Sequence, residues 1–253
     1  MNDAGESTDV GGGLGPLVEG FLLGVLGLLL GGIIGIVGVL SLASLGVPVL
    51  QNVVLLVGIG VPLQGAGFIL ATVGYLRYRR LDVAYLRIRY PTFGDVGWSL
   101  GGVGLLFVAL AAIYGVVLLL GIGEPAEHEI VQLGLARPTV LLVLVPLSLV
   151  IIGPTEELLF RGAIQTRLVG AYGPGAGIAL TSIIFAVVHL PMYATGSAAA
   201  IATSIVVVFA LSLILGWLYE RTENLVVPAV VHGVYNTVLL GTLYLVAIDL
   251  LPW

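Results

Sequence analysis

The chain contains no cysteine, no lysine and little charge of either sign. The absence of cysteine excludes disulfides, cysteine-based metal sites and thiol catalysis. Charged residues make up 9% of the 253 residues, whereas an ordinary soluble domain has about 25%. Hydrophobic residues make up 59%, and the mean hydropathy is +1.17. Because a water-soluble fold could not cover so much apolar surface, the composition predicts a membrane protein.

The remaining charge is mostly acidic. The chain has 14 acidic and nine basic residues, a net charge of −5 and a pI near 5.0, which gives no reason to expect a nucleic-acid partner. Residues 1–16 are polar, acidic and glycine-rich, which predicts a disordered tail. This tail lacks the basic region of a secretory signal, so we expect the apolar stretch that follows to remain as a membrane span.

Long apolar stretches predict an all-α fold, a polytopic transmembrane helical bundle. About 20 apolar residues cross the hydrocarbon core of a bilayer. By this measure the predicted spans are residues 20–45, 53–76, 97–121, 138–160, 175–190, 198–219 and 225–250. The last stretch is long enough to bend or divide at Pro228 or Gly241, so seven and eight spans both fit. Glycine recurs almost every turn of the first span, which predicts close helix packing there.

The positions of the arginines predict the orientation. If the N-terminus is cytoplasmic, only Arg137 falls in an outside loop. The inside segments then hold Arg77, Arg79, Arg80, Arg87, Arg89, Arg161, Arg167 and Arg221. By the positive-inside rule we expect a multi-pass protein of the cell membrane with a cytoplasmic N-terminus.

The segment 77–98 mixes arginines with aromatic residues. This composition is typical of a stretch that lies along the cytoplasmic headgroups. Two interpretations remain open: an ordinary positive-inside loop with an aromatic belt, and a docking surface for a membrane-anchored substrate.

The first polar feature inside an apolar stretch is a pair of adjacent carboxylates, Glu156 and Glu157, followed by Arg161. Glu157 and Arg161 are four residues apart on a helix, so they can form an ion pair that offsets the cost of burial. Glu156 lies roughly 100° round the helix and has no such local partner, which suits a general base. The alternative is a helix end that reaches the headgroups, with both glutamates in water.

Two further polar features come from later spans. His189 ends an apolar stretch, four residues after Phe185, and His232 and Asn236 lie on one face of another predicted helix. Such groups are costly in a membrane unless they meet a partner or a water-filled cavity. Taken singly, each histidine has a structural alternative, such as a helix-to-helix hydrogen bond. The third histidine, His128, is placed in an outer loop.

Together these motifs, Glu-Glu-x-x-x-Arg, Phe-x-x-x-His and His-x-x-x-Asn, resemble those of the type II CAAX prenyl endopeptidases and their prokaryotic Abi-like (CPBP) relatives. The resemblance covers roughly residues 138–242. It implies that residues 138–253 form a catalytic membrane domain, whereas residues 17–137 are predicted to be N-terminal membrane helices from hydropathy alone. It also implies an active-site cavity that opens toward the cytoplasm.

The resemblance further implies a role for each motif residue. Glu156 would activate a water molecule with help from His189, His232 and Asn236 would support the oxyanion, and Glu157 and Arg161 would organise the site. The implied enzyme is a hydrolase that cleaves a membrane-associated peptide or protein, possible substrates including a prenylated CAAX terminus.

The same resemblance leaves the protease type open, because the family has been described both as metal-dependent and as metal-free. If Zn²⁺ is bound, Glu156, His189 and His232 would hold it. Asparagine is a poor zinc ligand and the pattern is not His-Glu-x-x-His, which favours metal-free water activation.

Two non-proteolytic functions also fit part of the sequence. A scaffold or immunity protein could keep the site and act by binding alone. A transporter or proton relay also uses intramembrane glutamate and histidine. Transporters are commonly built from inverted repeats, whereas here the unusual polar residues all lie in one half.

Overall fold

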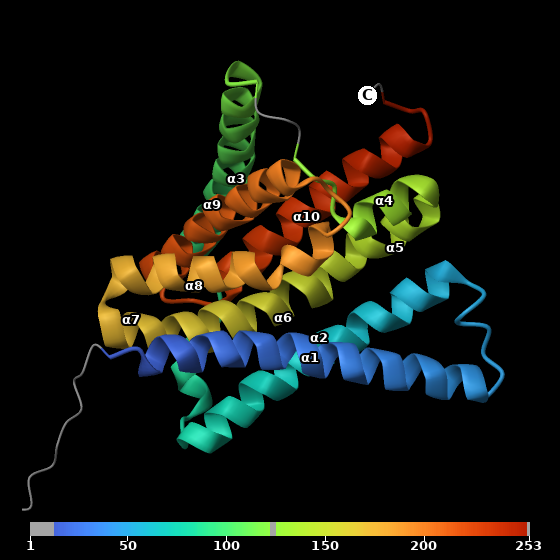
Figure 1. The fold of residues 1–253 in the computed structure, drawn as a ribbon. Coiled ribbons are helices and arrows are strands. Elements are labelled where there is room, and N and C mark those ends of the chain that lie inside the picture. The colour runs from blue at the N-terminus through green and yellow to red at the C-terminus, as the bar shows by residue number, and fades with distance from the viewer. Residues whose placement is uncertain (1–12, 122–124, 252–253) are drawn as a thin grey trace, which may run out of the picture.

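The computed structural model describes residues 13–121 and 125–251, and within these residues every regular element is helical (Figure 1). The predicted tail, residues 1–16, lies mostly outside the described residues, and the first helix begins at Gly15. The α-helices are α1 (Gly15–Ser44), α2 (Val53–Arg79), α3 (Phe93–Leu119), α4 (Glu129–Ala136), α5 (Pro138–Leu147), α6 (Gly153–Glu157), α7 (Thr166–Tyr172), α8 (Pro174–Val188), α9 (Ala198–Thr222) and α10 (Val226–Ala247). The shorter elements are η1 (Val83–Leu86), η2 (Ser148–Ile152), η3 (Leu158–Gln165) and η4 (Leu190–Tyr193).

Six helices in the described part of the chain are long and apolar enough to cross a membrane. They are α1, α2, α3, the continuous stretch from α5 to α7, α9 and α10. The predicted span at 175–190 corresponds to α8, which has only 15 residues and falls short of the length that a bilayer core requires. Helix α10 is undivided. The predicted count of seven or eight spans is therefore not confirmed.

The stretch from Pro138 to Tyr172 forms the centre of the bundle. In Figure 1 it lies between α1 and α2 on one side and α8 and α10 on the other, and it packs against all four. Two of its segments, η2 and η3, are π-helical, and they flank the single turn of α6. Pro154 has no amide hydrogen and its ring crowds the preceding turn, which favours a wider turn just before it. This departure from regular helix carries the two adjacent glutamates.

The glycines of α1 allow the close helix packing that their spacing predicts. A Cβ atom added at Gly27 would meet Leu159 and Phe68, and one added at Gly31 would lie 2.8 Å from the backbone oxygen of Gln64 in α2. One added at Gly35 would meet nothing within 4 Å. The prediction of close packing is therefore confirmed for the first part of α1.

Ion pairs gather most of the arginines at one end of the bundle. Glu19 of α1 bonds to Arg79 of α2 and Arg167 of α7, at 3.4 Å and 2.8 Å. Arg87 pairs with Glu220 near the end of α9 at 3.1 Å. Arg161 is an exception, because it lies inside the bundle with none of its side chain exposed. The prediction that it belongs to a cytoplasmic loop is therefore wrong. The cytoplasmic orientation of this arginine-rich end stays a prediction.

The segment 77–98 lies at the arginine-rich end. Its aromatic side chains include Tyr90 and Phe93, which are 95% and 98% exposed. Arg89 anchors the segment, since it pairs with Asp95 at 3.2 Å and donates to the backbone oxygen of Thr222 at 2.6 Å. Exposed rings on an anchored segment fit both interpretations, the aromatic belt and the docking surface.

Candidate active site

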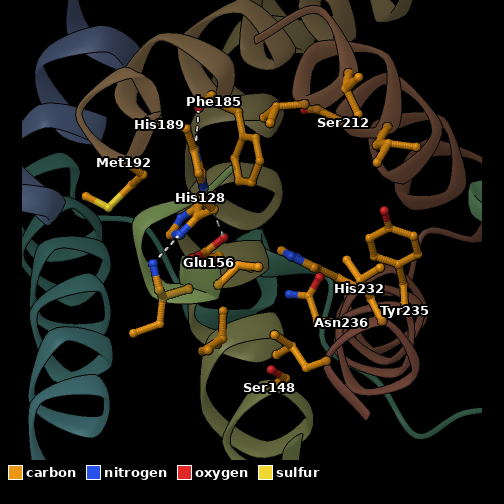
Figure 2. A pocket seen from close by; sticks show the side chains of 18 of the residues that line it. His128, Ser148, Glu156, Phe185, His189, Met192, Ser212, His232, Tyr235 and Asn236 are labelled. Atoms are coloured by element: carbon orange, nitrogen blue, oxygen red, sulfur yellow. Dashed lines mark hydrogen bonds and ion pairs between the residues drawn. The ribbon is translucent and has the colours of Figure 1, made fainter. Parts of the chain in front are cut away.

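The three motifs meet around one cavity of about 580 Å³ in the middle of the bundle (Figure 2). Glu156 lies in α6, His189 is the residue directly after α8, and His232 and Asn236 lie in α10. All four line the cavity, together with many apolar side chains. The structure therefore brings together residues that lie up to 80 positions apart in the sequence.

Glu157 and Arg161 form the ion pair that their spacing predicts. The Nε atom of Arg161 lies 3.0 Å from Oε2 of Glu157, and neither side chain is exposed. The other carboxylate oxygen of Glu157 lies 2.9 Å from Nδ1 of His232. Arg161 also donates to the hydroxyl of Ser212 on α9 at 3.2 Å. One buried carboxylate thus joins the central stretch to α10 and, through arginine, to α9.

Glu156 has a different environment although it is the next residue. Its Oε2 atom lies 3.9 Å from Nε2 of His189, and the two side chains are 15% and 20% exposed. This distance is too long for a hydrogen bond. Nδ1 of His189 lies 2.7 Å from the backbone oxygen of Phe185. A carbonyl can only accept, so Nδ1 carries a hydrogen and the Nε2 of the neutral ring presents its lone pair to Glu156.

Phe185 holds the histidines and the arginine of the site in place. Its ring lies 4.3 Å from the ring of His189 and 6.3 Å from that of His232, centre to centre. The guanidinium carbon of Arg161 lies 5.1 Å from the centre of the Phe185 ring, a cation–π contact. The phenylalanine of the second motif thus supports members of all three motifs.

A close contact between backbones sets the distance between α6 and α10. A Cβ atom added at Gly153 would lie 2.8 Å from the backbone nitrogen of Gly233 and 2.9 Å from the backbone oxygen of Ala229. Gly153 precedes the two glutamates, and Gly233 follows His232. These glycines therefore allow the carboxylates and the histidine of α10 to approach each other.

His128 also lines the cavity, a placement that the sequence did not reveal. Figure 2 shows it next to His189 and Glu156. It belongs to the segment that precedes α4, where it caps the helix, because its Nδ1 accepts from the amide of Ile130 at 3.2 Å. Nothing in the spacing of the motifs points to it. The only signal in the sequence is that it is one of three histidines in the chain.

The segments between α-helices that border the cavity lie away from the arginine-rich end. They are residues 125–128 and residues 192–193. Helix α3 begins next to Arg89 and ends at Leu119, so the segment that follows it lies at the opposite end of the bundle. With the arginine-rich end in the cytoplasm, as predicted, these segments border the cavity from the outer side, so they give no support to a cytoplasmic opening, which stays a prediction.

The expected zinc ligands do not form a zinc site in this arrangement. Between residues 13 and 121 and between 125 and 251, no group of three or more His, Asp or Glu side chains is placed to hold a metal ion. Of the expected set, His232 bonds to Glu157 while His189 faces Glu156. A tetrahedral site needs its ligands around one point, which these side chains do not provide.

These features define a multi-pass helical membrane protein with a polar site enclosed by apolar helices. Residues 138–238 match a family model described as Type II CAAX prenyl endopeptidase Rce1-like. This match confirms, over residues 138–238, the resemblance predicted from the three motifs, and it supports a membrane-embedded protease. Neither the comparison with curated proteins nor that with solved structures gave a match.

Proposed function

We propose that the protein is an intramembrane endopeptidase that hydrolyses a peptide bond of a membrane-associated substrate. The observation that carries the proposal is the contrast between the two adjacent glutamates. Glu157 is fully buried and paired, whereas Glu156 faces His189 across 3.9 Å at the surface of the cavity. A carboxylate that is accessible and held opposite an imidazole is suited to general-base catalysis.

The distance of 3.9 Å between Oε2 of Glu156 and Nε2 of His189 is compatible with an attacking water that contacts both. A water molecule seated beside Glu156 and His189 can donate one hydrogen to the carboxylate and the other to the Nε2 lone pair. As the water oxygen bonds to the substrate's carbonyl carbon, Glu156 takes a proton. Cleavage of the C–N bond then releases an amine, to which Glu156 returns that proton.

Asn236 and His232 supply the groups proposed to stabilise the oxyanion. The amide of Asn236 lines the cavity and can donate a hydrogen bond to the oxygen on which negative charge develops. His232 is oriented by its bond to Glu157, and its protonated form would place a second donor, Nε2–H, on the other side of the ring. Glu157 and Arg161 act through His232, which makes them positioning residues.

The walls of the cavity suit a substrate with an apolar part. Besides the polar site, the lining includes Leu28, Phe68, Leu110 and Leu239. A lipid-modified peptide terminus or a segment of another membrane protein would bury apolar surface against these side chains.

The test is hydrolysis of a library of membrane-associated peptides by the purified protein in detergent. Loss of a general base lowers rates by roughly 10²- to 10⁴-fold, so we expect that loss in Glu156→Gln and a comparable one in His189→Ala. Glu129→Gln, which alters an exposed carboxylate in α4, is the control. Equal turnover by wild type, Glu156→Gln and His189→Ala would overturn the proposal.

A parallel assay with and without a chelator separates the two protease types. Water activation by Glu156 and His189 alone predicts that hydrolysis survives prolonged chelation. Loss of hydrolysis that added Zn²⁺ restores would instead assign the water activation to a metal.

A further inference from the structure

His128 occupies the proposed active site without belonging to any of its motifs. It precedes the family match by ten residues, since that match begins at residue 138. It nevertheless lines the same cavity as Glu156, His189 and Asn236. His128 therefore reaches the cavity from outside the residues that match the family model.

The segment that carries His128 is fixed in place against α9. The amide of Ala126 donates to the backbone oxygen of Ala200 at 3.1 Å, and the hydroxyl of Ser204 donates to the backbone oxygen of Ala126 at 2.8 Å. The ring of His128 packs edge-to-face on Tyr193 of η4, with centroids 5.3 Å apart. The imidazole is therefore held at the cavity by contacts on both sides.

The hydrogen bond at the start of α4 fixes the tautomer of this imidazole. The amide of Ile130 can only donate, so Nδ1 of His128 must present a lone pair and the hydrogen of the neutral ring lies on Nε2. Burial, with a smaller contribution from His189, lowers the pKa of His128 to about 4. The ring is thus neutral at physiological pH, with one acceptor already used and one donor left.

That donor has a counterpart in the substrate but none in the described part of the chain. No hydrogen bond from Nε2 of His128 reaches another described residue; its only one is made by Nδ1. A peptide in the cavity carries backbone carbonyl oxygens, which only accept hydrogen bonds. The carboxylate of Glu156 and the Nε2 atom of His189 are acceptors as well, so they cannot bind these oxygens. Asn236 and His232 are the donors proposed for the oxyanion, so a neutral N–H group beside Glu156 and His189 supplies a donor for a further carbonyl of the substrate.

We propose that the Nε2–H group of His128 binds a backbone carbonyl oxygen of the peptide substrate and so fixes the chain beside Glu156 and His189. This inference rests on the proposed function. It makes His128 a substrate-binding residue contributed by the N-terminal part of the chain. The site is then completed by a residue outside residues 138–238, which match the family model.

Two substitutions separate this role from helix capping. In His128→Asn, the side-chain oxygen stands near the position of Nδ1 and preserves the cap, since asparagine is a preferred N-cap residue, but the Nε2–H donor is lost. In His128→Gln, the amide reaches the position of Nε2 and preserves a donor, while the cap is weakened. A substrate-binding role and a structural role therefore predict opposite orders of activity.

We expect His128→Asn to keep the thermal stability of the wild type and to raise KM roughly 5- to 30-fold, the factor for one lost hydrogen bond that leaves its partner unpaired. A contact equally strong in ground and transition states leaves kcat unchanged. His128→Gln should keep a KM near that of the wild type even if it unfolds at a lower temperature. Wild-type KM in His128→Asn, or a raised KM in His128→Gln alone, would overturn the inference.

The failure of this inference is distinguishable from the failure of the proposed function. Hydrolysis that depends on Glu156 but has the same KM in wild type and His128→Asn overturns only the role of His128. Hydrolysis that is unaffected by Glu156→Gln overturns the endopeptidase mechanism and the inference with it.

Discussion

The buried carboxylate of Glu157 should be far more important for stability than the neighbouring carboxylate of Glu156. In Glu157→Gln the side chain keeps its shape and an oxygen that can accept from His232, but it loses its charge. Arg161 is then left without its counter-ion in the interior, where none of its side chain is exposed. The hydroxyl of Ser212 is a neutral partner and does not compensate a full charge.

The expected size of the effect follows from the burial of both partners. Removing one member of a buried ion pair costs about 3–5 kcal/mol, because the other charge stays buried and unpaired. Glu156→Gln removes a partly exposed charge that lies 3.9 Å from its histidine, and it should change stability by less than about 1 kcal/mol. The double variant Glu157→Gln/Arg161→Met removes both charges of the pair, so it should be more stable than Glu157→Gln alone.

Unfolding in mixed micelles with increasing SDS, followed by tryptophan fluorescence, measures these differences. The rings of Trp98 and Trp217 are in edge-to-face contact at 5.6 Å, so their emission should report the separation of α3 from α9. Glu156→Gln is the matched control, one residue away. Equal stability of Glu156→Gln and Glu157→Gln would refute the assignment of the buried charge, as would a double variant less stable than both single ones.

Three further predictions concern packing, topology and pH. Gly153→Ala places a methyl group against the backbone of α10, so it should lower the free energy of unfolding by about 1–3 kcal/mol and reduce hydrolysis. Gly35→Ala is the control, because a methyl group there meets nothing within 4 Å, and it should leave stability and hydrolysis unchanged. Because the chain has no cysteine, single substitutions Tyr90→Cys and Glu127→Cys can be labelled with a membrane-impermeant maleimide. We expect labelling from the cytoplasmic side and the outer side respectively, and labelling of both from one side would contradict the predicted topology. The pKa of His128 is about 4, below the roughly 6.5 of a histidine in the unfolded chain. As the pH falls from 6.5 toward 4, the unfolded chain binds a proton that the folded protein does not, so the free energy of unfolding decreases. Between pH 7 and 4.5 wild type should therefore lose more stability than His128→Asn, by on the order of 2 kcal/mol, and parallel losses would contradict this pKa.

Local spacing was enough to predict contacts within one helix. Glu157 and Arg161 are four residues apart and form the expected ion pair. His232 and Asn236 share a helix face and both line the cavity. These predictions succeed because the positions of side chains along a helix follow from its period alone. Hydropathy was likewise sufficient to find the six long apolar helices in the described part of the chain, since the thickness of the bilayer fixes the minimum length of a span.

Contacts between segments far apart in the chain could not be predicted in this way. The spacing of residues predicts only Arg161 as a partner of Glu157, whereas in the structure His232 of α10 also binds this carboxylate. The positive-inside rule assigned Arg161 to a cytoplasmic loop, although the residue packs against Ser212 of α9 and the ring of Phe185. The sequence placed His128 outside the site, because the fold of the segment before α4 decides whether that side chain reaches the cavity.

The different environments of the two glutamates follow from helix geometry and need no special sequence signal. Consecutive residues of a helix point about 100° apart, so when α6 packs on α10 only one of two adjacent carboxylates can face the interior. Glu157 takes that position and is paired twice, which leaves Glu156 at the cavity. The paired glutamate orients His232 while the accessible one faces His189. Two adjacent glutamates thus contact the two histidines from different sides of one helical turn. Neither glutamate could take the position of the other unless that turn rotated.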